Sequence, residues 1–142
     1  NNAVLAGELG LPEPQPFLVL KGSPVGLASE CQIGRAELVE RLRGVTGRNP
    51  YVVAAGPEVC RRVGLVTGGA GGELAAAAEA GMDTFITGEG AHWTHAMAEE
   101  LGVNLIYGGH YATETFGVKA LAMHLQKKFG LTWEFIDHPS GL

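Results

Sequence analysis

Short apolar runs alternate along the chain with segments in which apolar residues recur at helical spacing. The short runs are rich in β-branched residues and are bounded by glycine, proline or charged residues, a pattern typical of strands. They span residues 17–20, 51–55, 63–67, 84–87 and 104–107. The segments with helical spacing span residues 3–9, 35–43 and 73–80, followed by one that ends at Leu101 and one that ends at Phe129. This alternation predicts strands and helices in turn.

The last predicted helix carries the clearest apolar stripe. Its members repeat at intervals of three or four residues, so they share one face of the helix, which we expect to face the core. They are Val118, Leu121, Ala122, Leu125 and Phe129. Beyond this helix, residues 132–136 alternate between polar and apolar side chains, which predicts a closing strand at an edge of the sheet.

Three units of strand, turn and helix follow one another between residues 63 and 129. Strands that alternate with helices of about ten residues favour an α/β fold in which at least part of the sheet is parallel. A length of 142 residues suits one domain, so we expect residues 1–142 to form a single domain. In such sheets, ligands bind beyond the carboxyl ends of the strands. We therefore expect the chemistry in the loops that follow these strands.

The composition narrows the class of protein. Hydrophobic residues make up 46% and charged residues 18% of the chain, which excludes a disordered tail and a coiled coil. The net charge of −5 argues against nucleic acid as a partner. No apolar run approaches the roughly 20 residues of a membrane span, and the first residues lack a signal-peptide pattern, so we expect a cytoplasmic protein without a membrane partner. Cys31 and Cys60 form no C-x-x-C pair and are expected to be reduced thiols.

Two of the loops hold candidate chemistry that the sequence leaves open. Residues 67–72 could offer backbone N–H groups to an anion. They match neither a P-loop nor a dinucleotide-binding motif, so a tight turn is the alternative. Residues 87–95 place Glu89 close to His92 and His95. This carboxylate and its two imidazoles could form part of a site, or they could simply mark the exposed start of a helix.

The third loop offers metal ligands. His110 follows a strand and Glu114 comes four residues later at the start of a helix, so one helical turn places both side chains on one side. Imidazole and carboxylate together suit divalent ions such as Zn, Fe, Mn or Ni. A histidine ligand must be neutral, which predicts that metal affinity falls below roughly pH 6. The alternative is structural, with Glu114 a first-turn acid that interacts with the helix dipole and His110 a capped core histidine.

Together the three loops resemble one known family. Residues 66–71 are Val-Thr-Gly-Gly-Ala-Gly, residues 83–89 are Asp-Thr-Phe-Ile-Thr-Gly-Glu, and residues 109–114 are Gly-His-Tyr-Ala-Thr-Glu. In this order and spacing they are similar to the motifs of the Nif-three-like family of dinuclear-metal proteins, whose members are commonly labelled GTP cyclohydrolase I type 2 homologues. The resemblance extends more loosely over the whole chain.

The resemblance implies a three-layer α/β/α fold with a mixed sheet, built from two related halves in the full family. It also implies a ring-shaped homohexamer with two divalent metal ions in each subunit. The family's histidine and glutamate ligands fall on His110 and Glu114. The remaining ligands, two adjacent histidines and an aspartate, belong to an N-terminal half that this chain does not contain. The chain therefore resembles the C-terminal portion of a family member, and His92, His95 and His138 stand in none of the ligand positions.

For function, the resemblance implies a metal-dependent hydrolase that acts on a nucleotide-like substrate, with GTP ring opening as the labelled reaction. In this reading Glu89 is the candidate for proton transfer or for support of a metal ligand. The alternative is a non-catalytic metal-binding oligomer that serves as a scaffold or regulatory protein. The alternative stays open because the sequence shows neither a P-loop nor a base-recognition motif.

Overall fold

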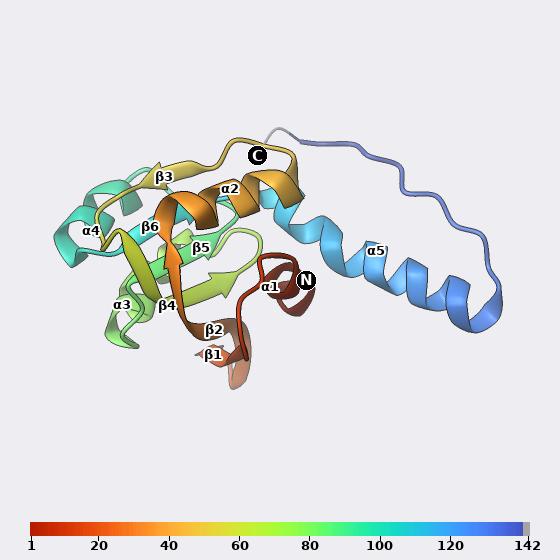
Figure 1. The fold of residues 1–142 in the computed structure, drawn as a ribbon, viewed down its shortest axis with the longest axis horizontal. Helices are drawn as coiled ribbons and strands as arrows, with labels where there is room; N and C mark the ends of the chain where they lie inside the picture. The colour runs from red at the N-terminus through yellow and green to blue at the C-terminus, as the bar shows by residue number, and fades with distance from the viewer. Residues whose placement is uncertain (141–142) are drawn as a thin grey trace.

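Six strands form one mixed sheet in the computed structural model, which describes residues 1–140 (Figure 1). The strand order across the sheet is β1-β2-β4-β5-β6-β3. The central strands β4 (Val59–Val66), β5 (Thr84–Thr87) and β6 (Asn104–Tyr107) are parallel to one another. The flanking strands β1 (Gln15–Leu20), β2 (Ser23–Gly34) and β3 (Tyr51–Val53) pair antiparallel. The partly parallel sheet expected from the sequence is confirmed.

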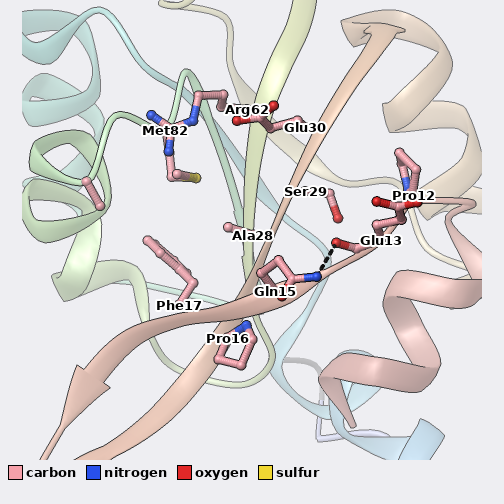
Figure 2. Close-up of a pocket in the computed structure, with 11 residues that line it drawn as sticks. Pro12, Glu13, Gln15, Pro16, Phe17, Ala28, Ser29, Glu30, Arg62 and Met82 are labelled. Carbon is pink, nitrogen blue, oxygen red and sulfur yellow. Dashed lines mark hydrogen bonds between the residues drawn. The ribbon is translucent and has the colours of Figure 1, made fainter.

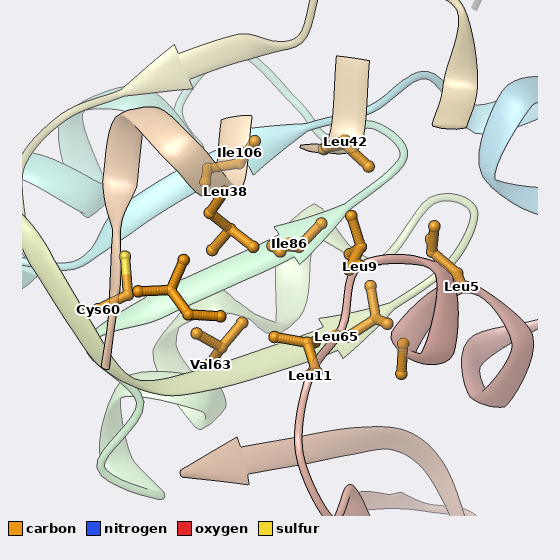
Figure 3. Packing of buried hydrophobic residues seen from close by; sticks show 12 residues of the cluster. Leu5, Leu9, Leu11, Leu38, Leu42, Cys60, Val63, Leu65, Ile86 and Ile106 are labelled. Atoms are coloured by element: carbon orange, nitrogen blue, oxygen red, sulfur yellow. The ribbon is translucent and has the colours of Figure 1, made fainter. Parts of the chain in front are cut away.

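Helices cover both faces of this sheet. On one face, α1 (Asn2–Glu8) and α2 (Arg35–Thr46) bury leucine side chains against the central strands, as Figure 3 shows. On the other face lie the short 3-10 helix η1 (Gly71–Glu73), α3 (Leu74–Glu79) and α4 (Thr94–Leu101). Buried residues of α3 and α4 share a cluster with Phe85. The three-layer α/β/α arrangement is therefore confirmed, and it places the ends of β4, β5 and β6 between two helical layers.

Strand β2 was not expected from the sequence. Val25, Leu27, Cys31 and Ile33 do alternate with a period of two, which is the signal that could have found it. Glycine weakens this signal because it is a poor strand former. In β2 the packing requires glycine at position 26, since a Cβ on Gly26 would lie 2.7 Å from Cγ2 of Val66.

Two expectations at the C-terminal end are wrong. Residues 132–136 form no strand, and the chain after α5 (His110–Phe129) runs back along that helix instead of joining the sheet (Figure 1). The apolar stripe does not face the core, because α5 is longer than the layer it belongs to and its second half projects from the body (Figure 1). Val118, Leu121 and Phe129 are 56%, 58% and 60% exposed, whereas Ala122 and Leu125 are half-buried. Helical spacing identifies an apolar face but does not show what covers it.

Despite this apolar stripe, α5 does not have the character of a membrane span. Within residues 1–140, no helix combines the length and the apolar composition that crossing a bilayer requires.

We expect Leu42→Ala and Leu121→Ala to differ sharply in their effect on the free energy of unfolding. Leu42 is fully buried, so its truncation should cost about 2–5 kcal/mol through lost burial and a cavity. Leu121 is 58% exposed, so its truncation should cost no more than about 0.5 kcal/mol. Urea denaturation at low protein concentration measures both. Equal losses for the two variants, independent of protein concentration, would contradict the exposed position of Leu121.

Candidate metal centre

The loops that follow β4, β5 and β6 meet at one edge of the sheet and are joined by backbone hydrogen bonds. The carbonyl oxygen of Gly68 accepts from the N–H groups of Gly88 at 2.8 Å and Glu89 at 3.1 Å. The N–H of Gly109 donates to the carbonyl oxygen of Gly88 at 2.9 Å, and that of Gly71 donates to the carbonyl oxygen of Glu89 at 3.0 Å. All three candidate loops therefore form one connected unit.

Two threonine hydroxyls add to this unit, and neither was expected from the sequence as a site residue. Thr87 donates its hydroxyl to the carbonyl oxygen of Gly68 at 3.0 Å and accepts from the N–H of Ala70 at 3.2 Å. Thr113 donates to the carbonyl oxygen of His110 at 3.0 Å and accepts from the N–H of Gly68 at 3.0 Å. Both threonines are fully buried. The signal that could have found them was their place beside Gly88 and Glu114 in the motifs.

These same bonds decide between the two interpretations of residues 67–72. The N–H groups of Gly68, Ala70 and Gly71 all donate to acceptors within the protein. An anion cradle needs several N–H groups that point outward together. The structure therefore favours the tight turn over the anion site.

His110, the first residue of α5, lies between two carboxylates. Its Nδ1 is 2.7 Å from Oε1 of Glu89, which reaches it from the loop after β5. Its Nε2 is 3.1 Å from Oε2 of Glu114, one turn further along α5. The side chains of Glu89, His110 and Glu114 are 39%, 37% and 48% exposed. The structure thus brings together all three residues that the sequence singled out.

This arrangement argues against the structural alternatives for His110 and Glu114. A side chain that is 37% exposed is no core histidine. Because α5 begins at His110, Glu114 lies beyond the first turn, which contains no acidic residue. The helix dipole acts mainly within the first turn, so it does not account for this carboxylate.

The two carboxylates raise the pKa of His110 above its ordinary value of 6.5. The hydrogen bond to Glu89 is the largest cause, the charges of Glu114 and Glu89 act in the same direction, and partial burial opposes them. Protons therefore compete with a metal ion for Nε2 at a higher pH than they would at an isolated histidine. Loss of metal affinity is accordingly expected to begin above the value of roughly pH 6 that the sequence suggested.

The glycines of the first loop make room for this pair. Gly68 has a φ of +78°, and a Cβ there would lie 2.8 Å from Oε1 of Glu114. A Cβ on Gly69 would lie 3.3 Å from Cε1 of His110. Larger residues would therefore displace either the imidazole or the carboxylate.

The geometry fits two ligands of one divalent ion. Bonds of about 2.1 Å at angles between tetrahedral and octahedral values place two ligand atoms about 3.0–3.4 Å apart, and Nε2 and Oε2 are 3.1 Å apart. Metal-bound histidines usually donate their other N–H to a carboxylate, which is the place that Glu89 occupies at Nδ1. Within residues 1–140, no three His, Cys, Asp or Glu side chains are grouped so that they could hold an ion.

The other candidate histidines lie elsewhere. Nδ1 of His95 shares a hydrogen bond of 2.6 Å with the hydroxyl of Tyr51. The backbone N–H of His138 donates to the hydroxyl of Tyr111 at 2.8 Å. His92 lines a pocket with Tyr51 and His95. None of the three completes the His110–Glu114 pair.

Another pocket, with a volume of about 510 Å³, lies at the opposite end of β4 (Figure 2). Phe17, Met82 and Arg62 contribute to its walls. None of the predicted site residues lines this pocket, so we do not assign the function to it.

Comparison with known proteins identifies relatives of the whole chain. The family described as Duf34/NIF3 (NGG1p interacting factor 3) matches residues 1–140. A protein of Deinococcus radiodurans named GTP cyclohydrolase 1 type 2 homolog is 39% identical, over 100% of this chain and 55% of the relative. A protein of the same name from Haemophilus influenzae is 40% identical, over 99% of this chain and 57% of the relative. The chain thus spans little more than half the length of these relatives.

Solved structures agree with the fold. TTHA1606 from Thermus thermophilus superposes with a TM-score of 0.80 at 42% identity, over 98% of this chain and 55% of that one. Protein ybgI, described as being of unknown function, superposes with a TM-score of 0.84 at 34% identity, over 98% of this chain and 56% of that one. Reduced HcgD from Methanocaldococcus jannaschii superposes with a TM-score of 0.78 at 26% identity, over 92% of this chain and 52% of that one.

We expect His110→Gln to change the pH dependence of stability in the presence of a chelator. Because the folded pKa of His110 is raised, its charged form stabilises the fold below about pH 6.5, and this contribution is lost as the pH rises through the folded value. The free energy of unfolding of the wild type should therefore exceed that of the variant most clearly below about pH 6, and the excess should shrink as the pH rises toward about 8. The difference should stay below about 1 kcal/mol, since water screens these partly exposed groups.

Urea denaturation over that pH range measures this difference, with His124→Gln on the exposed surface of α5 as the control. The control should show no comparable trend. A difference between wild type and His110→Gln that stays constant or grows toward pH 8 would contradict the charged pair.

Proposed function

Because the chain belongs to the Duf34/NIF3 family, we propose that His110 and Glu114 bind a divalent metal ion and that the complete centre hydrolyses a nucleotide-like substrate. One observation carries the proposal. Nε2 of His110 and Oε2 of Glu114 lie 3.1 Å apart, while Nδ1 is held by a carboxylate from another loop. This is the geometry of a histidine prepared to bind metal through Nε2.

The chain's own residues determine the state of that imidazole. When Nδ1–H donates to Glu89, Nε2 is left with its lone pair directed toward Glu114. In the absence of metal, a proton on Nε2 bridges the same gap, and both carboxylates raise the pKa of His110 by stabilising that charged form. Metal and this proton therefore compete for the same nitrogen, so metal binding is coupled to proton release.

A bound divalent ion supplies Lewis acidity, which lowers the pKa of water and polarises a substrate. Glu89 can contribute beyond orienting His110. Its Oε1 is occupied by Nδ1 of His110, but the side chain is 39% exposed, so the carboxylate remains accessible to solvent and substrate. We assign it to proton transfer or to support of His110.

Two ligands do not complete a metal centre, since tetrahedral sites use at least three protein ligands. The relatives are almost twice as long as this chain, and the proposal places the missing ligands in the part of them that this chain does not span. With these ligands the centre would hold two divalent ions, with Zn, Fe, Mn and Ni as candidates.

Self-association into a homohexamer is part of the same proposal. Its support is the exposed apolar stripe of α5, which a partner surface would cover. Light scattering of a version extended to the length of the relatives should give a hexamer mass, and a monomer at micromolar concentration would overturn it.

Cytoplasmic location is supported by Cys31 and Cys60, which are free thiols whose pKa values are raised by burial.

A non-catalytic metal-binding scaffold is the second candidate function. It is favoured by the glycine loop after β4, in which the N–H groups of Gly68, Ala70 and Gly71 donate within the protein and are not free to bind a phosphate. A regulatory oligomer would need the metal for assembly and would need no nucleotide site.

We expect His110→Ala combined with Glu114→Ala to weaken binding of Zn²⁺ by more than about 100-fold, since loss of a supporting carboxylate alone costs about 10–100-fold. Glu89→Gln should fall within that smaller range. The matched control is His95→Ala combined with Glu99→Ala, which removes another His and Glu pair four residues apart on a helix. Elemental analysis and calorimetry on the extended protein measure the effect. Unchanged metal content in the first variant would rule out the centre.

We expect the extended protein to hydrolyse GTP only when divalent metal is present. Chelation should abolish turnover, and added metal should restore it, because the ion supplies the activated water. Chromatography of the products measures the reaction. Tight metal binding without turnover of GTP or another nucleotide would reject the hydrolase and support the scaffold.

A further inference from the structure

A second pocket is lined by residues of β3, β6 and α4 and of the loop that carries Glu89. In Figure 1, β3, β6 and α4 lie together at the end of the body away from the projecting part of α5. Its volume is about 380 Å³, within the range of roughly 300–1,000 Å³ found for small-molecule sites. Aromatic and small residues dominate its walls. They include Tyr51, Tyr107, His92, His95, Thr94 and Gly90.

Two tyrosine rings form one wall of this pocket. Tyr51 of β3 and Tyr107 of β6 are direct partners across the antiparallel pair. Their rings stack with centroids 6.0 Å apart and an angle of 17° between their planes. Tyr51 is 52% exposed, so much of its ring stays accessible to another flat group. Aromatic faces attract such groups through stacking.

Hydrogen bonds hold both rings in place before any ligand arrives. The hydroxyl of Tyr51 shares a bond of 2.6 Å with Nδ1 of His95, and Nε2 of His95 is 3.5 Å from Oε1 of Glu99. The hydroxyls of Tyr107 and Thr94 lie 2.5 Å apart. Rings fixed in this way lose little conformational freedom on binding, which favours a preformed site.

The pocket also offers an unused polar group. Among residues 1–140, the imidazole of His92 makes no hydrogen bond or ion pair with another residue, although it lines the pocket. A flat ring that carries nitrogen or oxygen atoms at its edge could pair with it. A purely apolar ring would form no hydrogen bond with His92.

Gly90 links the pocket to the metal centre. It follows Glu89 directly, and a Cβ on it would contact the hydroxyl of Tyr107 and lie 2.8 Å from Cα of Gly71. The aromatic wall therefore packs on the backbone of the loop whose carboxylate holds His110. A ring in the pocket would lie beside the groups that are candidates for chemistry.

We infer that this pocket binds the planar heteroaromatic ring of a small molecule, such as a purine or pyrimidine, through stacking on Tyr51 and a polar contact to His92. The inference deepens the proposed function and rests on it for one point, that the ring belongs to the substrate of the metal centre. A polynucleotide is disfavoured, since the chain carries a net charge of −5.

Calorimetric titration of the chain with guanosine, adenosine and uridine, in the presence of a chelator, tests the inference. We expect saturable binding to the wild type and binding that is about five- to 100-fold weaker in Tyr51→Leu, which keeps apolar bulk but removes the ring. Tyr51→Phe keeps the ring but loses the hydroxyl bond to His95, so its binding should fall between that of the wild type and that of Tyr51→Leu. Phe129→Leu, an exposed aromatic far from the pocket, should have no effect.

A local reporter is available in Trp93, which stands between His92 and Thr94 and is 48% exposed. In a Trp133→Phe background it is the only tryptophan, so its fluorescence should change with the nucleosides and not with ribose. No saturable binding, or equal binding in wild type and Tyr51→Leu, would overturn the inference. The chelator separates the two proposals, because ring binding needs no metal and metal binding by His110 and Glu114 needs no ring.

Discussion

The candidate site depends on one backbone acceptor, the carbonyl oxygen of Gly68. It receives the N–H groups of Gly88 and Glu89 and the hydroxyl of Thr87, at 2.8, 3.1 and 3.0 Å. These bonds bring the loop after β5 onto the loop after β4. They also set the position of Glu89, and through it the orientation of His110. A Cβ on Gly88 would lie 2.6 Å from that oxygen, so the motif needs glycine at both ends of the contact.

The sequence predicted those parts of the site that depend on the spacing of nearby residues. The bounds of β5 and β6 follow from short apolar runs that glycine ends, and the pairing of His110 with Glu114 follows from the pitch of a helix. β2 was missed because glycine weakens its period-two alternation. The reason for Gly26, which is its close packing on Val66 of the neighbouring strand, is visible only in the folded chain.

Spacing alone also fails to single out the site. The chain contains two pairs of histidine and glutamate that stand four residues apart on a helix, His95 with Glu99 and His110 with Glu114. They differ in the side chains that other parts of the fold place beside them. His110 receives a carboxylate from Glu89, whereas His95 receives the hydroxyl of a tyrosine. One pair suits a metal ion and the other helps to close an aromatic pocket, and this difference exists only in the folded chain.

The length of α5 has a consequence for motion. Its first turns are anchored, because Ala112 and Thr113 are buried and Asn1 accepts a hydrogen bond from the N–H of Gly117 at 2.6 Å. Beyond Gly117 the helix is supported mainly by its own ladder and by the returning tail, and isolated helices of that length are marginal in water. Backbone amides in this half should therefore exchange with solvent through local fraying, while those beside His110 exchange only through larger openings. One continuous helix thus combines a rigid base for the site with a distal arm of low local stability.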